Sequence, residues 1–180
     1  DFAQVNEQFR LRIARFGPLG ELDAAIGANA SINGSIRALN ANANGPMLIG
    51  GSFSNIAGSG FSYIGRLDGA GKLDRSFDPG SGPNDWVNAI ATYQHGAGSQ
   101  ILICGNFSSY NGNGLQGLVS VNLDGSIDER FDPATRLDGS VNAIAVQHDG
   151  KLLIGGAFNH VGAATRHFIA RLNAEDRKST

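Results

Sequence analysis

This sequence has little with which to build a disulfide framework or a charged surface. One cysteine in 180 residues excludes an intrachain disulfide. Charged residues make up 17% of the chain and the formal net charge is −2, so there is no basic surface of the kind that binds nucleic acid. No apolar run approaches the roughly 20 residues that a transmembrane helix needs. We therefore expect neither nucleic-acid binding nor membrane insertion.

The motifs of common catalytic and metal sites are also missing. The four histidines lack the close spacing and the cysteine partners of a zinc site. There is no Gly-x-Ser-x-Gly motif, phosphate-binding loop or dinucleotide fingerprint. Cys104 lies on a predicted strand, where a thiol is more often small and buried than reactive. We predict no catalytic residue, no cofactor and no metal.

Repeated carboxylates are the one pattern that suggests calcium. Asp74 with Asp78 returns as Asp128 with Asp132. Calcium takes six to eight oxygen ligands, and no dense Asp-x-Asp-x-Asp loop is present. The simpler interpretation is that each Asp accepts hydrogen bonds from a turn and recurs because the unit recurs.

What the chain does contain is glycine and a repeat. Its 26 glycines are about twice the usual share of roughly 7%. The repeat has a period of 51 residues, lengthened once by a three-residue insertion that we place in a loop at 92–99. One segment occurs four times, at Ile13–Phe16, Ile64–Leu67, Leu118–Val121 and Ile169–Leu172. Such a period is typical of a repeat architecture.

Each unit has the local pattern of β-strands. In the central unit, Val87–Ala91, Ile101–Gly105 and Gly117–Val121 are short apolar or alternating runs, separated by turn-forming residues. A weaker fourth strand ends near Phe77 or Phe131. About four strands per unit predict an all-β fold made of β-propeller blades of antiparallel strands. The alternative is a β-trefoil, which would leave the fourth copy of the repeated segment without a role.

The combination of motifs resembles a known family. Val-Asn-Ala-Ile-Ala, Gly-Lys-Leu-Leu-Ile-Gly-Gly-Ala-Phe, Ile-Ala-Arg-Leu and Gly-Ser-Ile-Asp-x-x-Phe-Asp-Pro are similar to the delta-60 repeat of bacterial cell-surface proteins, over Phe2 to Asn173. The resemblance implies a β-propeller in a large extracellular scaffold or adhesive protein. It implies no catalytic residue.

The repeat also predicts how the chain is organised. Residues 1–173 hold three and a fraction units, and residues 174–180 form a tail. The unit landmarks are Phe2, Phe53, Phe107 and Phe158. Propellers usually have four to eight blades. We therefore expect either that this chain is part of a longer propeller chain or that it completes a ring by self-association.

Candidate binding residues lie where the units differ. Trp86 stands where the sister units have serine and follows Asp85, while Tyr93 and His95 lie in the expected inserted loop. Variable loops on a rigid scaffold commonly carry recognition, so we predict ligand contact by these four residues. Tyr110 aligns with aliphatic residues and is expected in the core.

A recurring arginine has two interpretations. Arg15, Arg66 and Arg171 occupy one repeat position, which Ser120 takes in the remaining unit. These arginines could bind an anion such as a carboxylated sugar. The simpler interpretation is a hydrogen bond from one blade to the next.

These observations favour a non-enzymatic, extracellular or cell-surface repeat scaffold or adhesion module that recognises glycan or protein through its blade loops. One alternative is a carbohydrate-active enzyme, a hydrolase or lyase, with Asp85 and Asp138 as its carboxylates. The other is a β-trefoil lectin.

Overall fold

The computed structural model describes residues 2–27, 31–41, 45–95, 98–131 and 137–173, and in these segments the regular elements are β-strands. No helix capable of crossing a bilayer occurs in these described residues. The predicted all-β class is confirmed.

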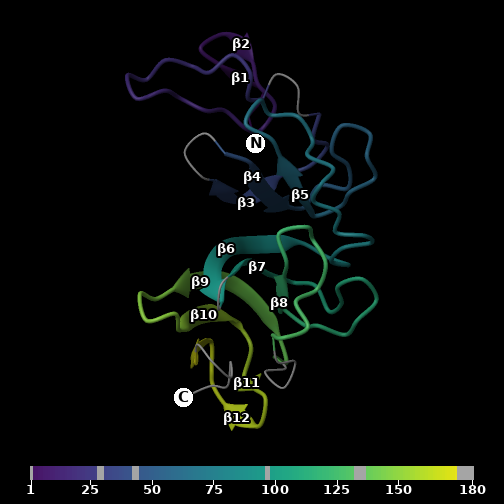
Figure 1. Ribbon diagram of the computed structural model, residues 1–180, viewed down its shortest axis with the longest axis vertical. Coiled ribbons are helices and arrows are strands. Elements are labelled where there is room, and N and C mark those ends of the chain that lie inside the picture. Colours follow the sequence, from purple (N-terminus) through teal and green to yellow (C-terminus); the bar gives the residue numbers. More distant parts are fainter. Residues whose placement is uncertain (1, 28–30, 42–44, 96–97, 132–136, 174–180) are drawn as a thin grey trace.

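Three antiparallel sheets of three strands follow one another along the chain. Their strands are β3 (Ile36–Ala41), β4 (Met47–Gly51) and β5 (Ile64–Leu67); β6 (Val87–His95), β7 (Gly98–Gly105) and β8 (Leu118–Val121); and β9 (Ser140–Val146), β10 (Leu152–Ala157) and β13 (Ile169–Leu172). In each sheet the second strand lies in the middle, with the unit's first strand on one side. The sheets stack in chain order (Figure 1), and the same topology recurs in all three units.

Small hairpins lie toward the two ends of the stack. They are β1 (Gln4–Val5) with β2 (Gln8–Phe9), and β11 (His160–Val161) with β12 (Ala164–Thr165). The weak fourth strand appears only as a single bridge in each described unit, Phe16 to Leu22, Leu67 to Leu73 and Val121 to Ile127. The expected fourth strand is thus much shorter than the sequence pattern predicts.

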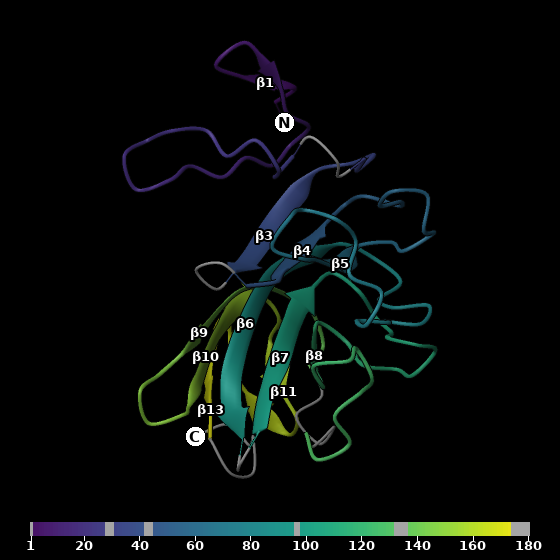
Figure 2. The same ribbon diagram turned by 45° about the horizontal axis from the view of Figure 1, so that its top comes forward.

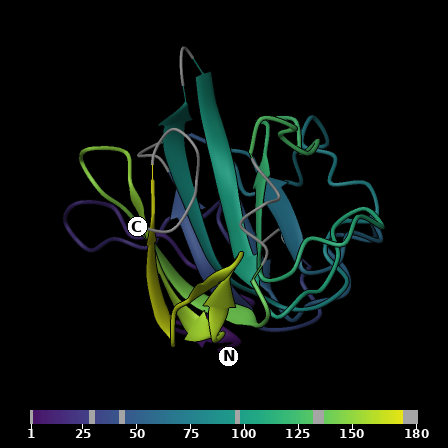
Figure 3. The ribbon, with the colours of Figure 1, turned by 90° about the horizontal axis from the view of Figure 1, so that it is seen from below.

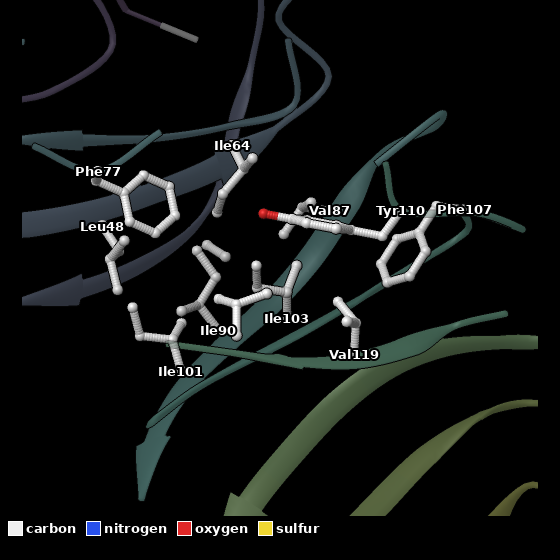
Figure 4. Close-up of a cluster of buried hydrophobic side chains, with 12 residues drawn as sticks. Leu48, Ile64, Phe77, Val87, Ile90, Ile101, Ile103, Phe107, Tyr110 and Val119 are labelled. Carbon is white, nitrogen blue, oxygen red and sulfur yellow. The ribbon is translucent and has the colours of Figure 1, made fainter. Parts of the chain in front are cut away.

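Apolar side chains on both faces of the middle strand fill the spaces between sheets. In β7, Ile103 packs toward the first sheet and Leu102 toward the third. Figure 4 shows the first of these spaces, where Ile64 lies beside Tyr110 and Ile103, and Leu48 lies beside Ile101. Tyr110 is fully buried, as predicted, and its hydroxyl donates to the Gly125 carbonyl oxygen at 3.0 Å. The sheets therefore contact one another through side chains that recur with the repeat.

Cys104 belongs to one of these contacts between sheets. It is fully buried in the cluster that contains Val141, and burial raises the pKa of its thiol. At the equivalent position of the first unit, a Cβ on Gly50 would collide with the side chain of Val87. A small side chain is required here because neighbouring sheets approach closely. The prediction that this thiol is buried is confirmed.

The last sheet leaves its outer face open. In the second sheet, five residues pack against the third sheet: Ala89, Ala91, Leu102, Cys104 and Leu118. The residues at the same repeat positions of the third sheet are, in the same order, Ala143, Ala145, Leu153, Gly155 and Ile169. Leu118 is 5% exposed, whereas Ile169 is 66% exposed. We call these five residues the open blade face. It has the composition of an interior contact and lies on the surface.

The inserted residues lengthen a hairpin instead of forming a loop. β6 and β7 pair from Val87 with Gly105 to His95 with Gly98, and the insertion extends this ladder. Figures 2 and 3 show both strands reaching past the strands of the neighbouring sheets. The expected loop at 92–99 is therefore wrong, because alternating side chains allow Thr92–His95 and Gly98–Ser99 to continue the two strands.

Candidate functional site

A β-bulge interrupts the first strand of every sheet at the same repeat position. The register skips Arg37 in β3, Asn88 in β6 and Asn142 in β9. A bulge leaves one residue unpaired and redirects its side chain. Three equivalent bulges thus release three side chains from their ladders, one arginine and two asparagines.

The bulge side chains line a shared concavity of about 410 Å³. Its lining residues are Arg37, Trp86, Asn88, Asn106 and Asn142. Trp86 immediately precedes β6, and Asn106 directly follows β7 in the same sheet. All three sheets contribute to this concavity through their first strands or the residues beside them, and polar side chains predominate in its lining.

A hydrogen-bonded amide network orders one side of the concavity. The Asn88 Nδ2 group donates to Asn106 Oδ1 at 2.9 Å, to Asn142 Oδ1 at 3.0 Å and, more weakly, to the Val141 carbonyl at 3.5 Å. Because the Val141 carbonyl oxygen can only accept a hydrogen bond, the nitrogen side of the Asn88 amide must face it. Asn106 and Asn142 then turn their oxygens toward Asn88.

Arg37 lies on the indole of Trp86. The guanidinium carbon is 4.4 Å from the ring centroid, within the range of a cation–π contact. Among the described residues, no hydrogen bond or ion pair involves the Arg37 guanidinium. Trp86 remains 40% exposed. The pair therefore presents a positioned cation beside the amide network.

The structure separates the four predicted site residues into two pairs. Asp85 and Trp86 precede β6, whereas Tyr93 and His95 lie near its other end. Seven residues of strand span roughly 23 Å, so Trp86 and Tyr93 do not form one aromatic cluster. The Asp85 carboxylate accepts a hydrogen bond from the Trp86 amide at 2.7 Å. The side chain of His95 lies outside the described part of the chain.

Tyr93 borders a second hollow of about 570 Å³ at the far end of β6. This hollow is lined by Pro46, Arg66, Thr92, Tyr93, Gln94, Ser99, Leu123, Val146, Gln147, His148 and Gly150. Tyr93 itself is 4% exposed, and its hydroxyl shares a hydrogen bond with Ser120 Oγ at 3.1 Å. Its hydroxyl group therefore bonds within its own sheet.

Ser120 and its neighbours replace the recurring arginine in the central unit. Ser120 Oγ donates to Asp128 Oδ2 at 3.3 Å, and Arg130 Nε donates to Asp128 Oδ1 at 2.8 Å. In the preceding unit, Arg66 Nε donates to the equivalent Asp74 at 2.8 Å. Arg130 thus gives Asp128 the guanidinium partner that Ser120 cannot.

We expect Asp128 to make the fold sensitive to acid. Burial favours a higher pKa for its carboxyl, but hydrogen bonds from Arg130 and Ser120 outweigh burial and lower the pKa below its usual value near 3.8. A lowered folded-state pKa stabilises the fold above the unfolded-state pKa, and this contribution is lost as pH falls through the folded-state pKa. Asp128→Asn should cost about 2 kcal/mol at pH 7. In urea unfolding below pH 4, its difference from wild type should shrink; a constant difference would contradict this role.

The recurring arginines connect neighbouring units. Arg15 Nη2 donates to the Gly69 carbonyl at 3.2 Å, and Arg66 Nη1 donates to the equivalent Leu123 carbonyl at 2.6 Å. Each acceptor lies in the next unit of the repeat. The blade-to-blade interpretation is confirmed for these two arginines.

The remaining carboxylates have local partners. Asp138 Oδ1 accepts from the Asn159 and His160 amides at 2.8 and 2.9 Å, and Oδ2 contacts His160 Nδ1 at 2.9 Å. The hydrogen bonds from His160 lower the pKa of Asp138. Asn84 accepts the same two amide bonds one unit earlier. Asp138 therefore fills a repeated structural position.

The carboxylate pairs considered for calcium also serve turns. Asp74 accepts from Ser76 and Arg66, and Asp78 accepts from the Gly80 amide at 2.8 Å. Asp132 lies outside the described residues. Within the described segments, no group of three or more His, Cys, Asp or Glu side chains is arranged to hold a metal.

Comparison with known families adds one match. The model of a family described as a domain of unknown function (DUF5122) beta-propeller matches residues 43–77, 100–131 and 147–176, together more than half of the chain. Each matched segment contains the third strand of one unit and all or most of its second strand. No curated protein and no solved structure gives a match.

Proposed function

Because the chain belongs to this DUF5122 β-propeller family, we propose that it is a non-enzymatic binding module in a repeat scaffold or adhesion protein. Its ligand site is the concavity lined by Arg37, Trp86 and the three asparagines. Propeller blades surround a common axis and carry variable side chains on a constant frame. Binding of glycan or protein fits this frame better than chemistry, for which the described residues offer no assembled group.

One observation carries this proposal. The bulge recurs at the same place in all three sheets, but its residues are Arg37, Asn88 and Asn142. Packing explains residues that stay the same at each repeat. It does not explain why a fixed backbone feature should present arginine once and asparagine twice to one shared concavity. Ligand recognition accounts for both the constant bulge and its variable side chains.

The location of the protein and its self-association are part of the same proposal. Resemblance to the delta-60 repeat supports an extracellular or cell-surface location. The open blade face supports contact with a further unit of the same kind, because the second sheet buries the equivalent residues against the third. We propose that a second copy of this chain supplies that contact by self-association, since an exposed interior-type face favours burial.

Binding should depend on Trp86. We expect the chain to bind members of a panel of polysaccharides and peptides, and Trp86→Ala to weaken binding about tenfold or more, because it removes the support of Arg37. Phe168→Ala is the control, since Phe168 is a 65% exposed aromatic outside the concavity. Surface plasmon resonance would measure both variants. Absence of binding to the whole panel, or equal loss in both variants, would refute the proposal.

A further inference from the structure

We propose that the concavity binds the carboxylate of a uronate residue in an acidic polysaccharide. This inference rests on the proposed function, because it names the ligand class for the same site. Its basis is that the described side chains converging there present hydrogen-bond donors. The relevant groups are the Arg37 guanidinium and the outward amide nitrogens of Asn106 and Asn142.

The amide network sets the direction of those nitrogens. Asn88 uses its Nδ2 group toward the oxygens of Asn106 and Asn142. An asparagine amide carries an acceptor oxygen on one side and a donor nitrogen on the other. Both Nδ2 groups therefore face away from Asn88. Asn142 is exposed and comes from the neighbouring sheet, so two sheets supply donors to one ligand.

Arg37 supplies the charge. Its guanidinium is held on Trp86 at 4.4 Å, while its N–H groups make no hydrogen bond to the described residues. Guanidinium matches a carboxylate through two parallel hydrogen bonds. Since Arg37 covers one face of Trp86, the tryptophan orients the cation and leaves less indole surface for a sugar ring. This favours an acidic sugar over a neutral one.

Asp85 directly precedes Trp86 and is the acidic residue nearest in sequence to those that line the concavity. It does not line the concavity, and its Oδ1 accepts the Trp86 amide at 2.7 Å. That hydrogen bond partly offsets its negative charge. The concavity itself is lined by one cation and three neutral amides besides Trp86. The side chains facing the ligand therefore carry net positive charge.

The lining also favours a sugar over an acidic peptide. Peptide recognition commonly relies on apolar anchor pockets or on strand addition at a sheet edge. Here the concavity offers polar side chains and a single indole already in contact with Arg37. Amide groups beside a guanidinium suit hydroxyls and a carboxylate on one ring.

The test compares three polymers on the intact chain by isothermal titration calorimetry: oligogalacturonate, neutral dextran oligomers and an oligo-glutamate peptide. We expect oligogalacturonate to bind best. Arg37→Ala should weaken that binding about tenfold, and Arg37→Lys less. Asn142→Asp keeps the acceptor oxygen for Asn88 but replaces the outward donor with negative charge, and should weaken binding similarly. Arg75→Ala is the control, because Arg75 is exposed and lies outside the concavity.

The outcomes separate this inference from the proposed function. Selective oligogalacturonate binding that is lost in Arg37→Ala and Asn142→Asp, but kept in Arg75→Ala, supports it. Equal binding of dextran, or binding indifferent to Arg37, overturns it while the binding function stands. Preference for oligo-glutamate also overturns it. If none of the three polymers binds, and none of them changes the thermal unfolding of the protein, this inference is overturned. If no member of the wider panel of polysaccharides and peptides binds either, the proposed function is refuted as well.

Discussion

Leu102→Ala is expected to destabilise the protein by about 2–5 kcal/mol, whereas Leu153→Ala, at the same position one repeat later, should cost less than about 1 kcal/mol in dilute solution. Leu102 is fully buried between the second and third sheets. Leu153 lies on the open blade face and keeps part of its surface exposed. Both substitutions remove the same atoms from equivalent strands. The difference between their free energies of unfolding therefore measures the contribution of the neighbouring sheet, which Leu153 lacks.

Protein concentration gives this comparison a second readout. If a second copy covers the open blade face, mass action stabilises the folded state as concentration rises. The cost of Leu153→Ala should then grow toward that of Leu102→Ala. Leu153→Asp should fold but remain monomeric in light scattering, because association would bury its carboxylate without a partner. A wild-type chain that stays monomeric at every concentration, with an unchanging cost for Leu153→Ala, would contradict self-association.

Much of the fold follows from the repeat in the sequence. The alternating runs at Val87–Ala91 and Ile101–Gly105 predict β6 and β7 because side chains in a strand alternate between two buried faces. Tyr110 is predicted in the core because it aligns with Ile56 and Val161, both of which are also buried. Equivalent positions pack in the same way where both have the same neighbouring residues. The match to a β-propeller family agrees with the fold that the repeat predicts.

The candidate site was only partly predictable. Trp86 stands out because its sister units have serine, and the structure places it in the concavity. Arg37, Asn88 and Asn142 were missed, although aligning the units shows arginine and asparagine in one column. Nothing in single residues signals that this column is a bulge, because a bulge is a property of how two strands pair. The amide network likewise depends on residues 18 and 54 positions apart.

For the three-residue insertion, the sequence predicts a loop, whereas the structure has strands. The glycines and the polar residues of the insertion favour a loop, and so Tyr93 is predicted to contact a ligand from that loop. In the structure the added residues extend both strands, and Tyr93 becomes buried beside Ser120. Ser120 is small where the other units have arginine. The space released there accommodates the tyrosine hydroxyl, which is a tertiary contact that local sequence does not reveal.

One glycine in each unit, Gly51, Gly105 and Gly156, links the fold to the site. A Cβ on Gly105 would collide with the Trp86 carbonyl oxygen, and a Cβ on Gly51 or Gly156 would meet the equivalent serine carbonyl. In all three sheets this glycine pairs with the residue just before the bulge. The glycine is therefore required by the bulge that directs Arg37, Asn88 and Asn142 toward the concavity.

Gly105→Ala should accordingly impair stability and binding together. The added methyl group meets backbone, which cannot move aside without breaking the pairing of β6 with β7, so we expect a loss of about 3 kcal/mol or more. Any folded fraction should show altered Trp86 fluorescence, since Trp86 must shift with its carbonyl. Gly114→Ala is the control, because its Cβ would meet no atom within 4 Å. It should change stability by less than about 1 kcal/mol. Equal effects of the two substitutions in urea unfolding would show that the bulge tolerates a side chain, and that the glycine does not hold the site in place.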